Sequence, residues 1–565
     1  MIHALFHSLR LGLGQLIRHL VRRLRPWPNV LELRLDGEVV EDQAPFTWLQ
    51  RFFPRPVIAL RDLILTLRDA ETDPEISILV LYLGPNSLGW GRAQELRQAL
   101  QSLRAAGKKT IAFLEEADTL DYFLATACDQ IIFTPLGSVG LTGLLSEVIY
   151  FKGTLDKLAI KPDLLQAGKY KSAVEPYLRT GMSRAQRESI NSLLDSLFQQ
   201  LVAGIAQARG LSAARVKSLI DNGPYLAAAA RDAGLVDHLL YEDELESHLQ
   251  KELGAEPVTA SWRRYRWLCG PGLTWRDPWR SFPALAVVYA TGVIHSGQSR
   301  SYGGITDSVG SETLCQALRE VREDPSVKAV VLRVDSPGGS GLASDLIWRE
   351  VSLFRGHKPV VVSMGDVAAS GGYYIAAPAD QILAQPGSIT GSIGVIAGKI
   401  NLQGLYEKVG LKKVIVTRGK QADLHSDYGP FSETGRRKVE AEMESFYREF
   451  VSKAAQGRKQ EYARMEKSAQ GRVWTGEQAQ ALGLVDGVGG LRQAIELAKR
   501  LAGIPLEQKA LLEILPRRRR FQLPGWTHFL PFSPLLSPAL SELISLEPLA
   551  GSRFLALLPF RLRIR

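Results

Sequence analysis

One serine lies among small residues in the segment AASGGYY, residues 368–374, where its type and its surroundings suit nucleophilic chemistry. Two glycines follow Ser370, and a second glycine pair, Gly338 and Gly339, comes directly after an apolar run in VLRVDSPGGSG. Glycine pairs let a chain turn sharply and leave backbone N–H groups unblocked. Two loops of this kind can direct N–H donors at one point, which is how an oxyanion hole for acyl transfer is built.

Each glycine loop also has simpler uses that the sequence leaves open. A tight turn is the commoner role of such glycines. Glycine-rich loops also bind phosphates, but neither segment fits the patterns G-x-x-x-x-G-K-[ST] or G-x-G-x-x-G. The combination of two glycine loops with Ser370 therefore favours acyl-transfer chemistry over a structural turn.

A nucleophilic serine needs a base, and no histidine lies close to Ser370 in the sequence. The same half of the chain contains His295, His357 and His425. Nothing in the sequence orients any of the three as a catalytic triad requires, so we expect solvated histidines. Lysine is then the remaining candidate for the base.

Ser370 lies in the second copy of an internal repeat with a constant offset of 251 residues. Asp73 precedes a proline as Asp324 does, and YFLATACDQI (122–131) aligns with YYIAAPADQI (373–382). Alignment without gaps over about a hundred residues indicates a duplicated domain. In each copy, short β-branched apolar runs alternate with amphipathic helical patterns, which is typical of an α/β unit.

The two copies keep different chemical groups at aligned positions. Thr119 stands opposite Ser370, and Ala422 stands opposite Lys171 of the segment GKYKSAVEPY. A lysine base must be neutral near pH 7, which requires lowering its pKa by roughly 3 units from about 10.4. Burial at a seam between the copies can supply such a shift. Although most single lysines are simply solvated, the complementary losses predict one composite site of Ser370 and Lys171.

We predict an α/β fold of tandem duplicated domains, in which the first domain supplies Lys171 and the second supplies Ser370. The predicted parts are a cationic amphipathic N-terminal segment (1–28), a first domain (29–260), a linker (261–282), a second domain (283–505) and a basic, proline- and aromatic-rich tail (506–565). Long amphipathic helices are expected over 184–210 and 436–458, where they would pack one domain or subunit on another.

The composition is that of a globular protein, with 45% hydrophobic and 23% charged residues in a chain of 565. The net charge of +10 suits an anionic partner, and because no nucleic-acid-binding motif is visible, we favour a membrane surface. Arginines interrupt the apolar runs of residues 1–28, so this segment is expected to lie in a lipid interface or dock on the chain's own body. Cys128, Cys269 and Cys315 have neither disulfide-framework nor zinc-ligand spacing.

Four motifs are similar to those of a known peptidase family. DSPGGS, AASGGYYIAAPAD, GSITGSIGV and GKYKSAVEPY resemble signal peptide peptidase A (protease IV) of the long, duplicated type, over about residues 30–500. The resemblance implies tandem domains with a fold like that of Clp protease and crotonase. It also implies a Ser–Lys dyad with Ser370 as nucleophile and Lys171 as general base.

The resemblance further assigns the groups around this dyad. The backbone N–H groups of Gly339 and Gly371 would form the oxyanion hole, and Ser392 would hydrogen-bond the lysine amine and orient it. Members of the family cleave remnant signal peptides within their apolar core, and the long type forms a bowl-like homotetramer at the membrane. The resemblance implies no cofactor and no metal.

Two features depart from the family pattern, and two other functions stay open. Members usually have an N-terminal spanning helix, which residues 1–28 do not resemble, so we expect a peripheral or weakly anchored membrane protein. The tail after about residue 505 matches no family motif, and its role is open. A crotonase-like acyl-CoA enzyme or a catalytically inactive scaffold would share the fold, but the intact Ser370–Lys171 pair argues against both.

Overall fold

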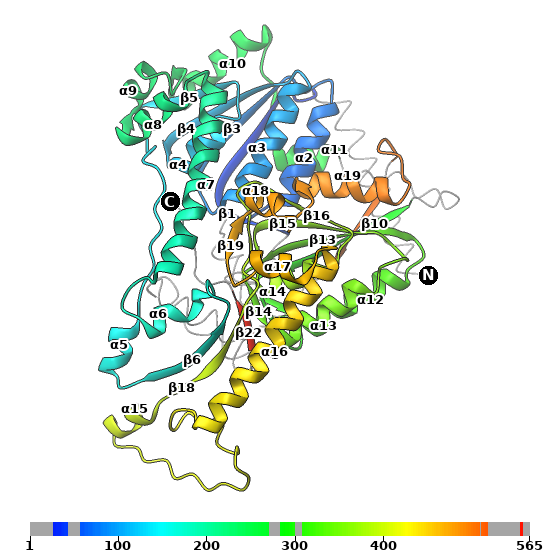
Figure 1. The fold of residues 1–565 in the computed structure, drawn as a ribbon. Coiled ribbons are helices and arrows are strands. Elements are labelled where there is room, and N and C mark those ends of the chain that lie inside the picture. The colour runs from blue at the N-terminus through cyan, green and yellow to red at the C-terminus, as the bar shows by residue number, and fades with distance from the viewer. Residues whose placement is uncertain are drawn as a thin grey trace.

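The computed structural model describes residues 26–42, 57–269, 283–299, 308–508, 510–517 and 554–557. The predicted amphipathic segment lies almost wholly outside these residues, as does most of the predicted tail. Two eight-stranded sheets, one from each half of the chain, form the body of the molecule, and a third, six-stranded sheet joins the halves (Figure 1).

The first sheet has the strand order β2-β1-β3-β4-β5-β7, with β8 beside β5 and β9 beside β1. Its central strands are parallel and carry buried apolar residues on both faces, as expected for a covered parallel sheet. The strands are β1 (Val30–Val40), β2 (Val57–Ala59), β3 (Ile78–Asn86), β4 (Lys109–Ala117), β5 (Gln130–Val139), β7 (Tyr225–Leu226), β8 (His238–Leu239) and β9 (Thr259–Ser261).

The helices of the first half include the long helix expected over 184–210, which is α7 (Arg184–Arg209). It reaches the second half of the chain, where Ile190 and Leu193 share an apolar cluster with Ile389 and Val473. The other helices are α2 (Leu60–Thr72), α3 (Trp90–Ala105), α4 (Thr119–Ala125), α5 (Lys152–Lys157), η2 (Ser172–Val174), α6 (Glu175–Leu178), α8 (Ala213–Asp221), α9 (Ala227–Asp232), η3 (Glu242–Glu244), α10 (Leu245–Leu253) and α11 (Trp262–Cys269).

The second sheet has the order β19-β17-β15-β13-β10-β21, with β16 between β15 and β20. It is built from β10 (Ala284–Thr291), β13 (Val327–Ser336), β15 (Val360–Ala369), β16 (Gln381–Ala384), β17 (Ile389–Gly391), β19 (Val473–Thr475), β20 (Gly487–Val488) and β21 (Leu511–Leu515). Its helices are α12 (Ser311–Glu323), α13 (Gly341–Ser352), α14 (Gly371–Ala376), α15 (Gln403–Lys408), α16 (Glu433–Gly457), α17 (Tyr462–Ser468), α18 (Gly476–Ala481) and α19 (Leu491–Leu501).

Short edge elements extend both halves beyond the predicted boundaries. Strand β21 pairs in parallel with β10, so the second sheet continues past residue 505. Strand β9 pairs with β1 and leads into α11, so the fold of the first half takes up the beginning of the predicted linker 261–282. Such short edge strands are defined by their partners across the sheet, and local pattern gives little sign of them.

The third sheet has the order β12-β11-β14-β22-β18-β6 and mixes strands from the whole chain. Strands β6 and β18 run antiparallel along their full length and form the lower arm of the molecule in Figure 1. This pairing carries the segment after β6, which contains Lys171, into the second half. The strands are β6 (Lys161–Ala167), β11 (Val293–His295), β12 (Ser308–Gly310), β14 (Gly338–Ser340), β18 (Val395–Asn401) and β22 (Phe554–Leu557).

The duplication is visible in matching internal hydrogen bonds. The buried hydroxyl of Tyr122 donates to the Leu235 carbonyl oxygen at 2.9 Å, and the aligned Tyr373 donates to the Leu484 carbonyl oxygen at 3.0 Å. Each half also has its own main apolar core around its sheet. The predicted tandem α/β fold is confirmed.

Candidate active site

Ser370 occupies a sharp turn between β15 and α14. Its backbone has φ 56° and ψ −113°, a conformation that is strained for a residue with a side chain. The turn is held because the Ser370 N–H donates to the Gly391 carbonyl oxygen at 2.8 Å, while the Tyr374 N–H donates to the Ser370 carbonyl oxygen at 2.8 Å. A serine on a strained strand-to-helix turn presents its hydroxyl in a fixed direction.

Lys171 reaches this turn from the first half of the chain. Its Nζ lies 2.7 Å from Ser370 Oγ and 2.9 Å from both the hydroxyl and the carbonyl oxygen of Ser392. The space for the lysine depends on two glycines: a Cβ on Gly471 would lie 2.5 Å from Lys171 Cβ, and one on Gly394 would lie 3.1 Å from Lys171 Cδ. The structure therefore brings Lys171, Ser370 and Ser392 together within a single chain.

The surroundings of Lys171 favour its neutral form. The side chain is completely buried, and burial lowers its pKa well below the ordinary value of 10.5. Within the described part of the chain, Lys171 forms no ion pair that would offset this. A neutral amine has two N–H groups, which can donate to the two Ser392 oxygens, and one lone pair, which can accept the hydroxyl proton of Ser370.

Ser392 is also held in a left-handed conformation, with φ 53°. It directly follows β17, and its N–H donates to the Arg472 carbonyl oxygen at 2.7 Å. In this position, both of its oxygens accept hydrogen bonds from the lysine amine. The backbone of Ser392 and its hydroxyl thus fix the amine in place.

The two glycine loops pack against each other beside Ser370. Gly338 and Gly339 have φ values of 96° and 156°, which favour glycine. A Cβ on Gly338 would lie 2.6 Å from the Gly371 nitrogen, and a Cβ on Gly371 would lie 3.1 Å from the Gly339 nitrogen. The amides of Gly339 and Gly371 are therefore close neighbours at the start of α14, as a pair of oxyanion-stabilising donors must be.

The histidines are not part of this site. His357 and His425 are exposed, as expected. His295 is instead buried, with Nε2 at 2.9 Å from Ser308 Oγ and Nδ1 at 2.8 Å from the Ser296 carbonyl oxygen. It lies in a strand of the third sheet, where two hydrogen-bond partners offset its burial, so the prediction of a solvated residue was wrong for His295.

Sequence reasoning missed a buried ionic cluster at the seam between the halves. The guanidinium of Arg333 in β13 donates to Glu41 at 2.8 and 3.0 Å and to Glu95 at 2.8 Å, and it also donates to Ser363. Arg333 is fully buried, and both carboxylates are nearly so. The only signal in the sequence was an arginine within the apolar run KAVVLRV.

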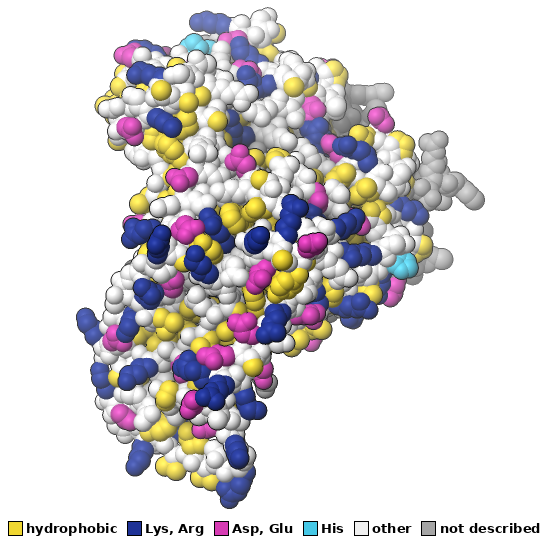
Figure 2. All heavy atoms as spheres, in the orientation of Figure 1, with side chains coloured by type: hydrophobic (Ala, Val, Ile, Leu, Met, Phe, Trp, Pro, Cys, Tyr) yellow, Lys and Arg dark blue, Asp and Glu magenta, His cyan; other side chains and the backbone are white. Residues whose placement is uncertain are grey.

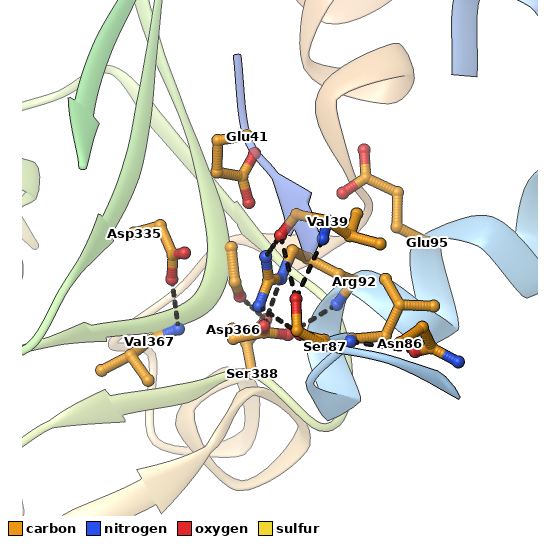
Figure 3. Close-up of polar contacts among 12 residues, drawn as sticks. Val39, Glu41, Asn86, Ser87, Arg92, Glu95, Asp335, Asp366, Val367 and Ser388 are labelled. Carbon is orange, nitrogen blue, oxygen red and sulfur yellow. Dashed lines mark hydrogen bonds and ion pairs between the residues drawn. The ribbon is translucent and has the colours of Figure 1, made fainter. Parts of the chain in front are cut away.

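A second part of this seam involves Asp366 and Val367 of β15, the strand that precedes Ser370 (Figure 3). The backbone N–H of Arg92 in α3 donates to Asp366 at 2.8 Å, and the Arg92 side chain pairs with the same carboxylate. Asp335 accepts a hydrogen bond from the Val367 N–H at 3.0 Å, and burial raises the pKa of Asp335 to about 7. The first half thus holds β15, the strand that ends directly before Ser370.

Two general findings bound the chemistry of the described residues. They include no group of three His, Cys, Asp or Glu side chains placed to hold a metal ion. In the same part of the chain, no helix combines the length and the apolar character that crossing a bilayer requires.

The duplicated α/β fold, with a serine on a strained turn beside a buried lysine, has the form of a serine peptidase. Comparison with protein families agrees with this class: two regions, residues 102–256 and 352–505, match the model of peptidase family S49, one in each half. The chain belongs to peptidase family S49 and is a serine protease.

Named relatives extend over most of the chain. Serine protease SPPA, chloroplastic, of Arabidopsis thaliana is 36% identical over 461 residues, which are 79% of this chain and 66% of that protein. Protease 4 of Salmonella typhi is 34% identical over 455 residues, 79% of this chain and 72% of the relative. Among solved structures, a ClpP1 mutant from Listeria monocytogenes matches 37% of this chain and 94% of its own, with 14% identity and a TM-score of 0.24.

Proposed function

We propose that this protein is a membrane-associated serine endopeptidase that degrades remnant signal peptides and other apolar peptides through a Ser370–Lys171 dyad. The observation that carries the proposal is the 2.7 Å distance between Ser370 Oγ and a buried lysine amine that has no counter-ion among the described residues. A nucleophilic serine with no histidine beside it can use such an amine as its base, because a lysine that is neutral can accept the serine proton and a protonated one cannot.

The mechanism proceeds through an acyl-enzyme. Lys171 Nζ accepts the hydroxyl proton as Ser370 Oγ attacks the peptide carbonyl, and the N–H groups of Gly339 and Gly371 stabilise the resulting oxyanion. The protonated lysine then donates that proton to the leaving amine, and the peptide C–N bond breaks. Water next attacks the ester with Lys171 again as base, while Ser392 keeps the amine aimed at the reacting oxygen.

The rate of catalysis by this route should increase with pH on the acid side of the pH profile. Burial lowers the pKa of Lys171, and only the neutral amine can act as the base. The value of kcat/KM is therefore expected to rise with pH as Lys171 loses its proton, and to do so below the pH at which an ordinary lysine titrates.

Membrane association and assembly are supported by surface chemistry. The net charge is +10, although Lys and Arg are interspersed with Asp and Glu over the face shown in Figure 2. Leu411, Val414 and Val416 are exposed in the chain that follows α15 on the lower arm. Exposed apolar side chains of this kind suit contact with another copy, so we place the homotetramer contact on this arm.

The test is to trap the acyl-enzyme. The protein is mixed with an activated ester of a short apolar peptide, quenched in acid, and digested for mass spectrometry. The expected result is one peptide-sized adduct on Ser370, and no adduct in a Lys171→Met variant. An adduct on another residue, or equal labelling of the lysine variant, would contradict the dyad.

Association and assembly have separate measurements. We expect sedimentation with vesicles that contain anionic lipid, and a mass of four chains by light scattering. Absence of vesicle binding at low salt would contradict the membrane proposal, and a monomer at all concentrations would contradict the tetramer.

A further inference from the structure

A strand from the far end of the chain completes the third sheet. Strand β22 lies between β14 and β18 and is antiparallel to both. Gly338, Gly339 and Ser340 pair with Leu557, Ala556 and Leu555 in turn. Figure 1 shows β22 in red beside β14.

The partners of β22 are the walls of the candidate active site. Strand β14 carries Gly339, whose amide is a proposed oxyanion donor, and β18 follows Ser392 by three residues. If β22 were withdrawn, β14 and β18 would face each other across a slot one strand wide, each with an unpaired edge. Edges of this kind bind an extended peptide through main-chain hydrogen bonds on both sides.

The carbonyl group of Ala556 lies close to both glycine loops. A Cβ on Gly338 would meet the Ala556 oxygen at 2.1 Å and the Gly371 nitrogen at 2.6 Å, so both atoms crowd the same side of Gly338. Ala556 itself is fully buried. Its carbonyl thus sits against the two glycine loops, one of which begins directly after Ser370.

Side chains on one face of β22 fill apolar space as a substrate would. Side chains alternate along a strand, so Phe554 and Ala556 share a face and Leu555 has the other. Ala556 belongs to the main apolar core of the second half, and the ring of Phe554 stacks on Phe446 of α16 with centroids 6.0 Å apart. These contacts suit a small residue beside the serine and an aromatic or large apolar residue two positions earlier.

We propose that Phe554–Leu557 occupies the peptide-binding groove of this enzyme as a built-in competitor of substrate, with the Ala556 carbonyl group at the oxyanion hole. Ser370 and Lys171 are both completely buried in this arrangement, so an outside peptide reaches them only after β22 leaves. The sequence of β22 also indicates the specificity of the groove. The groove should bind extended apolar peptides that have a small residue at the position of Ala556. This inference rests on the proposed function for the identity of the oxyanion hole.

The first experiment displaces β22 in the full chain. Ala556→Arg places a long charged side chain in a fully buried position, whereas Leu555→Arg, the matched control, changes a half-buried side chain on the other face. The readouts are the rate at which a small fluorophosphonate labels Ser370 and the steady-state kinetics on an apolar peptide. We expect Ala556→Arg to label at least about tenfold faster and to lower KM by a similar factor with kcat kept, because competition within the chain raises the apparent KM. Leu555→Arg should change both much less.

Equal labelling rates in wild type, Ala556→Arg and Leu555→Arg would contradict the proposal that β22 competes with substrate. The same result would not contradict the role of Ser370 as nucleophile. Cleavage after Ala556 in wild type, absent from Ser370→Ala, would support the placement of β22, since the chain would then have served as its own substrate.

A binding measurement separates this inference from the catalytic proposal. In a Ser370→Ala background, a fluorescent peptide of sequence FLALL is titrated against the chain with and without Ala556→Arg. We expect tighter binding when β22 is displaced, and equal binding would contradict the competitor whatever the chemistry. If Ser370 is never labelled but the difference in binding persists, the dyad fails and the competitor stands.

Discussion

The two halves of the molecule contain the same strand-to-helix turn in different chemical states. In the first half, Asp118 caps α4, and its carboxylate accepts hydrogen bonds from the N–H groups of Leu120 and Asp121, both at 2.8 Å. In the second half, the residue at the N-cap of α14 is Ser370, which aligns with Thr119, and among the described residues no side chain caps α14. The first turn has its amide donors satisfied internally, while the second leaves them for a ligand.

The loops that face these turns differ in the same way. In the first half, Ser87 Oγ accepts a hydrogen bond from the Val39 N–H at 2.9 Å, and Leu88 packs against the core. In the second half, the aligned Gly338 and Gly339 have no side chains and adopt conformations that favour glycine. In the first half, side chains thus occupy the loop and satisfy the backbone N–H groups that a ligand would otherwise bind. The fold of the domain is unchanged.

The lysine segments show the reverse loss. Lys171 of the first half is buried against the serine of the second, whereas the aligned Ala422 lies exposed on the lower arm. The proposed dyad needs one serine and one lysine, so under that proposal each copy was free to lose the group that the other supplied. Four predictions test this comparison.

The largest effect is expected from the pair itself. Ser370→Ala and Lys171→Met should each lower kcat/KM on an apolar peptide by about 10⁴-fold or more, and the double variant should be no worse than either, because the two residues act as a unit. Thr119→Ser, which places a serine at the aligned position of the first half, is the control and should match wild type. Activity in the combined Ser370→Ala, Thr119→Ser chain would show that the first half keeps a usable site.

The second largest effect is expected on stability, from a substitution at the seam between the two halves. Arg333→Met leaves Glu41 and Glu95 buried without their partner, which should cost about 3–5 kcal/mol of stability. The matched control is Arg319→Met, where an exposed arginine pairs with Glu350 and a much smaller loss of stability is expected. Urea unfolding midpoints compare the two variants, and equal losses would mean that the halves are held together elsewhere.

The role of Ser392 predicts a smaller loss of activity. Ser392→Ala removes one of the two oxygens that accept from the lysine amine, so kcat should fall by about 10- to 100-fold with KM little changed. Ser392→Gly also removes the hydroxyl but relieves the strain of φ 53°. Similar losses of kcat in both variants would assign the effect to the Ser392 hydroxyl. Full activity of the glycine variant would show that this hydroxyl has no catalytic role.

The smallest effect is a gain in stability. Burial lowers the pKa of Lys171, so in the unfolded chain this lysine binds a proton that it does not hold in the folded one. Stability then rises with pH from the folded pKa up to the unfolded value of about 10.4. Lys171→Met removes this penalty, so it should raise Tm near pH 7 by a few degrees, about 2–4 °C for each kcal/mol gained.

The gain from Lys171→Met should be largest at low pH and vanish as pH approaches the unfolded value. Lys169→Met is the matched control, since Lys169 is exposed two residues away. Scanning calorimetry over a pH series gives the comparison. If the gain in Tm from Lys171→Met is independent of pH, or equals that from Lys169→Met, Lys171 carries its proton in the folded protein.

Much of the site was predictable because its parts are local in the sequence. The serine between small residues, the glycine pairs and the expected α/β periodicity are each specified within about ten residues, where turn chemistry and burial pattern act. The buried Arg333 cluster and His295 were missed because burial of a polar residue depends on distant partners, and local pattern reports only the average environment.

By itself, the sequence determined the duplication, the α/β class and which groups each copy had lost, because aligned positions can be compared residue by residue. Tertiary structure alone decided that Lys171 and Ser370, which are 199 residues apart, meet within one chain. It also decided that β22 lies between β14 and β18. Both contacts depend on pairing between distant strands, β6 with β18 and β22 with β14, and the free energy of such pairing comes from partners that no local segment contains.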